Sequence, residues 1–325
     1  LSLEEARARR FSPKWEHAQI VRPKMPGVHV MDHIELGMLA EKIDWTPFFH
    51  AWEMRGVYPQ ILEDATRGEE ASSLYADAQR MLADIITNGS LTARAVVGLF
   101  PANTRGDGIE FYSDEQRDTI AATMHMLRQQ TDRGRSLPAY SLSDFVAPAD
   151  QGIDDYVGIF ALTAGIGTDA LVRRYEAAHD DYNAIMVKAL ADRLAEALAE
   201  FMHEEVRRRY WGYAPDEALS NEELIAEQYQ GIRPAPGYAA CPDHSEKRTI
   251  FSLLGVAESI DVQLTENCAM TPLASVSGYY FAHPDATYFS VGRIGRDQVT
   301  DYAARKGQTV AETERWLRSN LAYDS

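Results

Sequence analysis

The chain is poor in cysteine. Its 325 residues include two, Cys241 and Cys268. A disulfide-stabilised secreted scaffold uses four or more cysteines, and a four-cysteine zinc site needs as many. We therefore expect two reduced thiols, no disulfide framework, no zinc site of this kind and a cytoplasmic location.

The chain also lacks an excess of positive charge. Lys and Arg total 32 against 49 Asp and Glu, which gives a net charge of −17. Binding to nucleic-acid phosphates requires a basic surface, so this balance argues against a nucleic-acid partner.

Long apolar runs are missing as well. No run reaches the roughly 18 residues that a membrane-spanning helix needs, so we expect no membrane association. The charged start, residues 1–7, does not have the pattern of a secretory signal. The first residue is Leu1 and not Met, so we expect a fragment or an excised domain.

The composition is that of a folded protein, with 45% hydrophobic and 25% charged residues. Predicted strands and helices alternate without a repeated βα rhythm, which favours an α+β fold with an antiparallel sheet. The predicted strands are 28–34, 95–100, 109–112, 143–146 and 156–162, and a hairpin is predicted from 278–281 and 287–291. The predicted helices are 2–11, 36–42, 69–87, 168–211, 246–254, 296–306 and 309–318. Residues 119–130 favour a helix, although their first residues could be extended.

One stretch, residues 231–242, carries an unusual pattern of proline and glycine. Two prolines flank Ala235, and Gly237 follows, so the backbone is stiff and extended. Arg233 could hold a carboxylate with two parallel hydrogen bonds, and Tyr238 offers a flat face and a hydroxyl. The alternative is a plain connector between helices.

The long helical run 168–211 contains an acidic row. Asp192, Glu196 and Glu200 recur at every fourth residue, beside an apolar stripe on the neighbouring face. The arginines at 207–209 end this run, either opposing the helix dipole or forming a small basic dock.

Two further motifs lack a feature that their usual function requires. The loop that begins at Gly165 fits a loose dinucleotide pattern, but a second strand does not return within about 30 residues. His203 opens a sequence similar to a zinc-protease motif, but Arg207 stands where the second histidine is needed.

Several collinear segments together resemble the C-terminal activation domain of cobalamin-dependent methionine synthase. The segments are Ile43-Asp-Trp-Thr-Pro-Phe-Phe49, Val97-Gly-Leu-Phe-Pro-Ala-Asn103, His179-Asp-Asp-Tyr-Asn183, Tyr210-Trp-Gly-Tyr213, Gly231-Ile-Arg-Pro-Ala-Pro-Gly-Tyr238 and Val276-Ser-Gly-Tyr279 with His283-Pro-Asp285. The resemblance runs from near residue 30 to the end of the chain. It implies a single C-shaped α+β domain, residues 1–325, with a bent antiparallel sheet flanked by helices; residues 1–28 would be an N-terminal helix and a linker-like lead-in.

The resemblance also implies a function. Such a domain binds S-adenosylmethionine and positions its methyl group for reductive methylation of cob(II)alamin to methylcobalamin, which serves methionine biosynthesis from homocysteine. The cobalamin is bound by a partner domain, and a flavodoxin-type reductase supplies the electron. The sequence shows no cysteine cluster for a homocysteine zinc site and no corrinoid-ligand motif. The chain alone is therefore not expected to make methionine.

The binding residues that the resemblance implies are Asp44, Glu196, Arg233, Ala235, Tyr238, Tyr288 and Phe289. The sequence matches the family at all of these positions. Arg233 would hold the methionine carboxylate, and Asp44 and Glu196 would accept hydrogen bonds from the ammonium or the ribose. Catalysis would consist of positioning donor and acceptor, so no catalytic acid or base and no metal ligand is expected.

Two other hypotheses remain open from the sequence. The chain could be a non-catalytic docking module for a cobalamin-binding partner, with its acidic surface facing that partner. It could also be a nucleotide-dependent oxidoreductase built on the Gly165 loop. Binding of S-adenosylmethionine or of a nicotinamide or flavin separates these alternatives.

Overall fold

Six strands form the central sheet in the computed structural model of the protein, which describes residues 1–15, 20–134 and 137–324. Every neighbouring pair is antiparallel, and the order is β4-β3-β2-β5-β8, with β1 also pairing with β2. The strands are β1 Gly27–Ile34, β2 Thr92–Arg105, β3 Gly108–Tyr112, β4 Ile120–His125, β5 Asp155–Ile166 and β8 Ser275–Tyr280. A separate two-stranded sheet consists of β6 Gln263–Leu264 and β7 Met270–Thr271.

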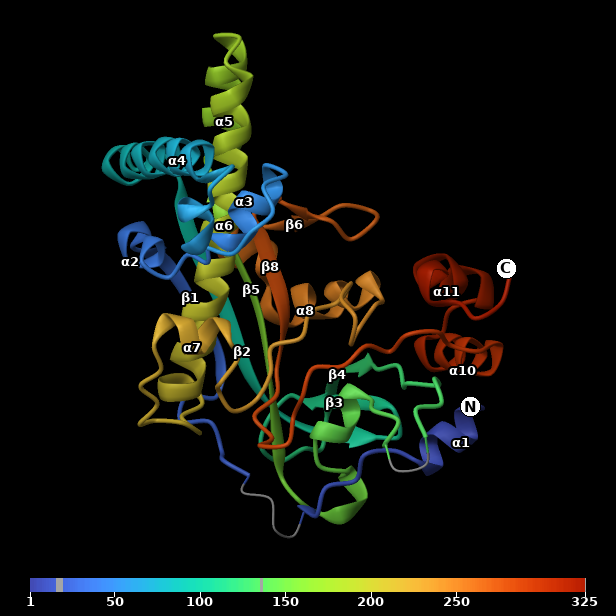
Figure 1. The fold of residues 1–325 in the computed structure, drawn as a ribbon. Coiled ribbons are helices and arrows are strands. Elements are labelled where there is room, and N and C mark those ends of the chain that lie inside the picture. Colours follow the sequence, from blue (N-terminus) through green and yellow to red (C-terminus); the bar gives the residue numbers. More distant parts are fainter. Residues whose placement is uncertain (16–19, 135–136, 325) are drawn as a thin grey trace.

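The length of β2 produces the bend in the sheet. The residues of β2 from Ala93 to Leu99 pair with β1, whereas Ala102 to Arg105 pair with β3 on the same edge. The other edge of β2 pairs with β5. Figure 1 shows β3 and β4 turned across the steep direction shared by β1, β2, β5 and β8. The α+β fold with a bent antiparallel sheet, predicted from the resemblance, is confirmed.

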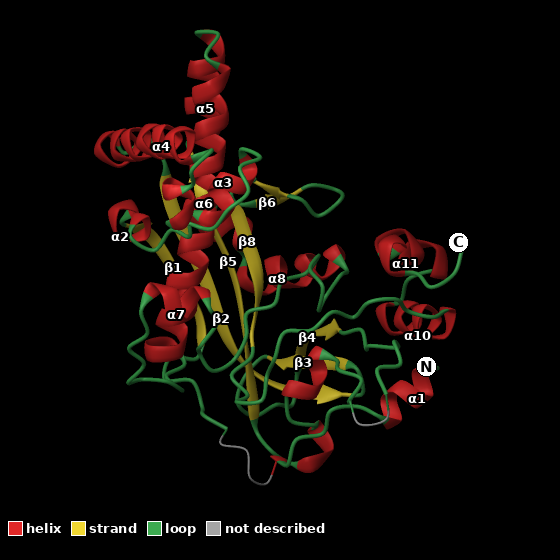
Figure 2. Cartoon of the chain, in the orientation of Figure 1, coloured by secondary structure: helices red, strands yellow, loops and turns green. Residues whose placement is uncertain are grey.

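Helices cover both faces of this sheet (Figure 2). Alternate residues of a strand point to opposite faces, so Phe160 and Leu162 belong to one core and Ile159 and Ala161 to the other. The first core includes residues of α4 Gly68–Asn88 and α6 Asp181–Glu205; the second includes residues of α8 Lys247–Leu254 and α9 Val256–Ile260. This double burial explains why β5 has the continuous apolar sequence of a buried strand.

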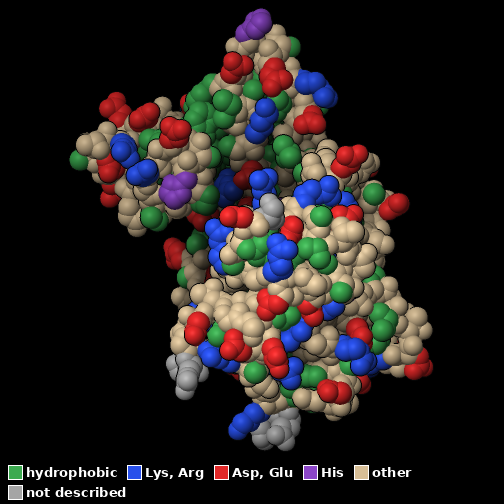
Figure 3. All heavy atoms as spheres, turned by 90° about the vertical axis from the view of Figure 1, so that its right-hand side faces the viewer, with side chains coloured by type: hydrophobic (Ala, Val, Ile, Leu, Met, Phe, Trp, Pro, Cys, Tyr) green, Lys and Arg blue, Asp and Glu red, His purple; other side chains and the backbone are tan. Residues whose placement is uncertain are grey.

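The remaining helices surround these layers. They are α1 Leu3–Ala8, α2 Leu36–Ala40, α3 Thr46–Ala51, α5 Thr168–Ala177, α7 Asn221–Ile225, α10 Arg296–Lys306 and α11 Val310–Trp316. A third apolar cluster packs α10 and α11 against the rest of the molecule. None of the helices in the described ranges is long and apolar enough to cross a bilayer. The face shown in Figure 3 is hollowed beneath the projecting α5–α6 hairpin, and its basic and acidic side chains are interspersed.

Several predicted elements differ from the structure. The helix predicted at 119–130 is wrong, and residues 120–125 form the strand β4 that the sequence allowed as an alternative. Pairing with β3 overrides the helical spacing of Ile120 and Met124. The strand predicted at 143–146 is wrong: Leu142–Phe145 is a 3₁₀ turn, which Ser141 and Asp144 close with a capping box.

The hairpin predicted from 278–281 and 287–291 is also wrong in its second strand. Residues 278–280 do lie in β8, and a turn follows in which the Ala286 N–H donates to the His283 carbonyl. The free edge of β8 is occupied by the segment around Ile232 instead, since Ile232 and Phe281 exchange two backbone hydrogen bonds of 3.0 Å. No edge is therefore left for residues 287–291.

The long helical run between 168 and 211 consists of three parts. α5 ends before His179, which adopts a positive φ of 57°. Asp180 then caps α6 by accepting a hydrogen bond from the Asn183 N–H. After α6 the chain makes one π-helical turn, Val206–Tyr210.

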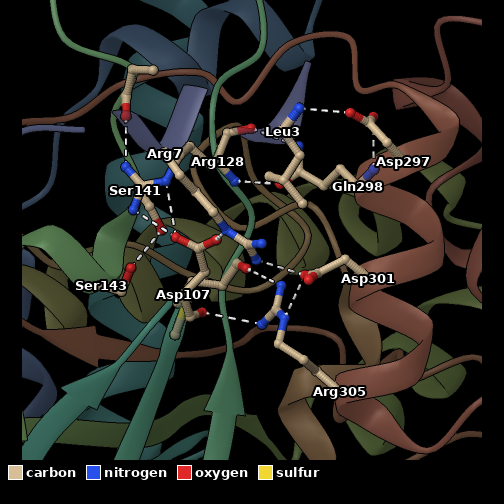
Figure 4. Close-up of polar contacts among 12 residues, drawn as sticks. Leu3, Arg7, Asp107, Arg128, Ser141, Ser143, Asp297, Gln298, Asp301 and Arg305 are labelled. Atoms are coloured by element: carbon tan, nitrogen blue, oxygen red, sulfur yellow. Dashed lines mark hydrogen bonds and ion pairs between the residues drawn. The ribbon is translucent and has the colours of Figure 1, made fainter. Parts of the chain in front are cut away.

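The N-terminal helix packs into the body of the protein. Arg128 is 1% exposed and donates to both Asp107 and Asp144, while Arg7 of α1 donates to the second oxygen of Asp107 at 2.7 Å (Figure 4). Arg7 also reaches Asp301 of α10 at 2.8 Å, so α1, α10 and the β3–β4 region share one polar network. Residues 16–19 of the predicted linker-like lead-in lie outside the described residues.

The Gly165 loop is explained by packing. Gly167 has a φ of 97°, and a Cβ atom there would lie 2.3 Å from the carbonyl oxygen of Ser90. A Cβ atom on Gly165 would lie 2.8 Å from the ring of Pro272. Both glycines therefore permit close contact between chain segments where β5 passes into α5.

Candidate functional site

The proline-rich segment 231–238 runs beside β8 as an irregular extra strand. The Tyr279 N–H donates to the Pro234 carbonyl at 2.9 Å, and the Phe281 N–H donates to the Ile232 carbonyl at 3.0 Å. The side chains of Ile232 and Pro234 are buried, whereas Arg233 and Ala235 are partly exposed. The segment is thus fixed along its length, and alternation places Arg233 and Ala235 on the same side of it.

Gly231 permits the close approach of this segment to β8. Its φ is 84°, and a Cβ atom would lie 2.4 Å from the carbonyl oxygen of Phe281 and 2.9 Å from the hydroxyl of Tyr213. A side chain at this position would separate the segment from β8.

A cavity of about 320 Å³ opens beside the segment. It is lined by Glu196, Glu227, Arg233, Pro234, Ala235, Tyr238, Ala239, Ala240, Val276, Tyr288 and Phe289. Six of the seven predicted binding residues are in this lining: Glu196, Arg233, Ala235, Tyr238, Tyr288 and Phe289. The walls combine aromatic and small apolar side chains with a few charged groups, which is typical of a small-molecule site.

A second cavity of about 380 Å³ adjoins the first and is more strongly charged. The two cavities share Glu196, Glu227 and Arg233. Asp44, the seventh predicted residue, lines this second cavity, together with Lys42, Pro47, Arg193, Ala197, Glu200, Asn221, Leu224, Ile225 and Tyr229. The structure therefore brings all seven predicted residues around two adjoining cavities, with Arg233 and Glu196 in the lining of both.

Arg233 is held by contacts on both its backbone and its side chain. Its N–H donates to the Tyr288 hydroxyl at 3.0 Å, and its Nη2 donates to Glu200 Oε2 at 3.1 Å. Burial acts to lower the pKa of Arg233, but the negative charge of Glu200, with smaller contributions from Tyr229, Tyr288 and Glu196, raises it. The guanidinium therefore remains positively charged at any physiological pH.

The other predicted residues surround this arginine. Asp44 accepts a hydrogen bond from the Thr46 N–H at 2.9 Å, at the start of α3. Tyr238 is 66% exposed at the rim of the first cavity. Partial burial of its phenol, together with the acidic neighbours Glu196 and Asp192, raises the pKa of that group. Phe289 stacks on Tyr140 with a ring separation of 5.7 Å.

Sequence reasoning missed three residues that contribute to the site. Glu200 pairs with Arg233, Glu227 lines both cavities, and Tyr229 lies 4.3 Å below the guanidinium of Arg207. Glu200 could have been predicted from the acidic row, because Glu196 and Glu200 are four residues apart and so lie on one face of α6. Glu227 and Tyr229 have no comparable motif, so only the folded chain identifies them.

The three consecutive arginines are all paired with acids. Arg207 is 0% exposed and forms a bidentate pair with Glu217, whereas Arg208 and Arg209 pair with Glu204 and Glu205 one turn earlier. These pairs account for the arginines as elements of local structure and leave little net positive charge for a basic dock. In the ranges that the structure describes, no group of three or more His, Cys, Asp and Glu side chains could hold a metal ion.

Two comparisons with known proteins give matches that span most or all of the chain. Residues 35–307 match the family model described as "Vitamin B12 dependent methionine synthase, activation domain". A solved structure, "Crystal Structure of the MetH Reactivation Domain bound to AdoHcy", is 54% identical, superposes with a TM-score of 0.97, and is matched over 100% of this chain and 99% of that chain. The protein belongs to the family of activation domains of vitamin B12-dependent methionine synthase.

Proposed function

We propose that this protein is the S-adenosylmethionine-binding reactivation domain of a cobalamin-dependent methionine synthase, and that the two adjoining cavities bind this ligand. The observation that carries the proposal is the position of Arg233, a fixed cation between a charged cavity and a mostly apolar one. S-adenosylmethionine has two ends that match these two cavities, a charged amino-acid end and a flat nucleoside end. The relative with 54% identity was solved with AdoHcy, the demethylated form of the same ligand.

Each of the seven residues has a role in this proposal. Arg233 holds the carboxylate as a charge-assisted pair, and Asp44 and Glu196 accept hydrogen bonds from the ammonium group or the ribose hydroxyls. Ala235 offers backbone groups to the adenine end. Tyr238, Tyr288 and Phe289 provide aromatic surface around the nucleoside. The acids also favour a ligand that carries a positive sulfonium.

The role of this chain in the reaction is to position the methyl donor. S-adenosylmethionine supplies an activated methyl group, and cobalamin on a partner domain supplies its acceptor. Residues of this chain orient the methyl donor toward that acceptor, and the chemistry requires no acid or base from them. A flavodoxin-type electron donor, a cytoplasmic location, and the inability of the isolated chain to make methionine are further parts of the proposal.

We also propose that residues 1–325 form one domain. The polar network that joins α1 to Asp107 and Asp301 supports this, because the N-terminal helix is tied to elements from the middle and the end of the chain. The shared apolar cores on both faces of one sheet support it as well.

Titration calorimetry with S-adenosylmethionine tests the binding site. We expect saturable binding to the wild-type chain and a loss of about 2–3 kcal/mol for Arg233→Ala, the range for removal of a charged hydrogen-bonding partner. Arg80→Ala is the matched control, since Arg80 is an exposed arginine on α4 outside both cavities. Equal affinities for wild type and Arg233→Ala would refute the assignment.

A further inference from the structure

A row of buried polar side chains lies behind Arg233, on one face of α6 and the turn that follows. Glu200, His203 and Arg207 are spaced three and four residues apart, so they share this face. They are 8%, 0% and 0% exposed. Glu200 binds Arg233 directly, and its other oxygen lies 3.8 Å from Nη1 of Arg207. The row therefore connects the candidate ligand site to the interior of the protein.

His203 lies at the centre of this row, between two tyrosines. Its ring stacks on Tyr280 with a centroid separation of 5.2 Å and meets the ring of Tyr229 edge-on at 4.7 Å. Burial lowers the pKa of His203 well below its usual value, and the nearby positive charges of Arg207 and Arg233 lower it further. The imidazole is therefore neutral and offers one hydrogen-bond donor and one acceptor.

Stacking alone does not require a histidine at this position. A phenylalanine would make the same ring contacts without the free-energy cost of burying two polar nitrogens. Within the described residues, neither nitrogen of His203 has a hydrogen-bond partner. What the imidazole adds to a phenyl ring is its capacity for hydrogen bonding in this buried region.

Other buried polar atoms near His203 also lack a hydrogen-bond partner. Glu200 Oε1, Arg207 Nη1, Arg233 Nε and the hydroxyls of Tyr213 and Tyr280 are buried, and each also lacks a partner among the residues that the structure describes. More than nine in ten buried polar groups in proteins are hydrogen-bonded, and bound water commonly supplies the missing partner. Two of these atoms, Glu200 Oε1 and Arg233 Nε, belong to the Glu200–Arg233 pair, so water shared among the atoms would connect the pair to the rest of the row.

We propose that His203 is a positioning residue for ligand binding, which acts through a buried hydrogen-bond network that fixes the Glu200 carboxylate and, through it, the guanidinium of Arg233. The inference rests on the proposed function, because it assigns Arg233 to the carboxylate of the ligand. A fixed guanidinium loses less conformational entropy when the ligand binds. His203 itself touches neither cavity.

Two substitutions at His203 separate hydrogen bonding from packing. His203→Phe keeps the stacking on Tyr280 and removes both nitrogens, so we expect S-adenosylmethionine to bind about tenfold more weakly. His203→Gln keeps one donor and one acceptor, so we expect it to restore most of the lost affinity. Urea denaturation of each variant verifies that it is folded. If His203→Phe does not fold, Tyr280→Phe replaces it and removes a single hydroxyl of the network.

A double-mutant cycle then tests the route through Arg233. We expect His203→Phe to have little further effect in an Arg233→Ala background, because the group that it positions is gone. Wild-type affinity for His203→Phe, or an equal loss with and without Arg233, would overturn the inference and leave the proposed function intact. Failure of the wild-type chain to bind S-adenosylmethionine would instead refute the proposed function.

Discussion

Arg233 is the residue on which the proposed ligand site depends, and its surroundings hold it in one place. Two prolines restrict the backbone on either side of Ala235, and backbone hydrogen bonds from Phe281 and Tyr279 fix the segment to β8. Glu200 holds the side chain. The sequence alone predicted the stiffness and the arginine, because both follow from local residue types. It did not predict Glu200 as the partner, because that contact joins residues 33 positions apart.

Gly231 provides a test of how closely the segment must approach β8. We expect Gly231→Ala to lower the free energy of unfolding by about 3 kcal/mol, since the added Cβ would meet the Phe281 carbonyl at 2.4 Å and the φ is 84°. We also expect weaker binding of S-adenosylmethionine. Urea denaturation measures the first effect and calorimetry the second.

Gly307→Ala is the matched control for this substitution. Gly307 has a φ of 65°, but a Cβ atom there would have no neighbour within 4 Å. We expect a loss of about 1 kcal/mol from backbone strain alone, without an effect on the ligand. Equal losses for the two variants would show that the close approach to β8 is unimportant.

The end of α6 shows how neighbouring residues of one type can differ in role. Arg207 and Arg209 are two residues apart, yet the side chain of Arg207 is 0% exposed and that of Arg209 is 72% exposed. The π-helical turn Val206–Tyr210 carries both. The sequence predicted only that three arginines end a helix, because their burial depends on Glu217 and on the tertiary packing of the following loop.

This difference leads to a prediction for Arg207→Met and Arg209→Met. We expect Arg207→Met to cost about 3–5 kcal/mol of stability, because it leaves Glu217 buried without its partner. We expect Arg209→Met to change stability by less than about 1 kcal/mol, since surface ion pairs contribute little. Chemical denaturation of both variants measures the contrast, and similar costs would contradict the assigned burial of Arg207.

Other elements were predictable to different degrees. Long periodic helices such as α4 and α10 were predicted closely, because their apolar spacing is unambiguous. Residues 287–291 were not, because a strand pattern does not reveal that the edge of β8 is already occupied by residues around Ile232. That competition places Tyr288 and Phe289 beside Arg233, where they line the first cavity.

At the scale of the whole molecule, the bent sheet and its two helical layers bring distant parts of the sequence to one site. α3 contributes to the second cavity, the residues after β8 contribute to the first, and α6 and the proline-rich segment contribute to both. The chain termini lie on the same side of the molecule (Figure 1). The N–H of Leu3 donates to Asp297 of α10 at 2.6 Å. Composition and periodicity predicted an α+β antiparallel fold, whereas its bent shape came from the family resemblance.

In the proposed function, this domain presents the methyl group of S-adenosylmethionine to cobalamin on a partner domain. The most direct measurement combines the chain with the cobalamin-binding domain of a methionine synthase loaded with cob(II)alamin, a reductant and methyl-labelled S-adenosylmethionine. We predict that label enters the cobalamin fraction only when the wild-type chain is present, and that Arg233→Ala strongly reduces its entry at limiting ligand. Label that enters the cobalamin equally with and without the chain would contradict the proposed function.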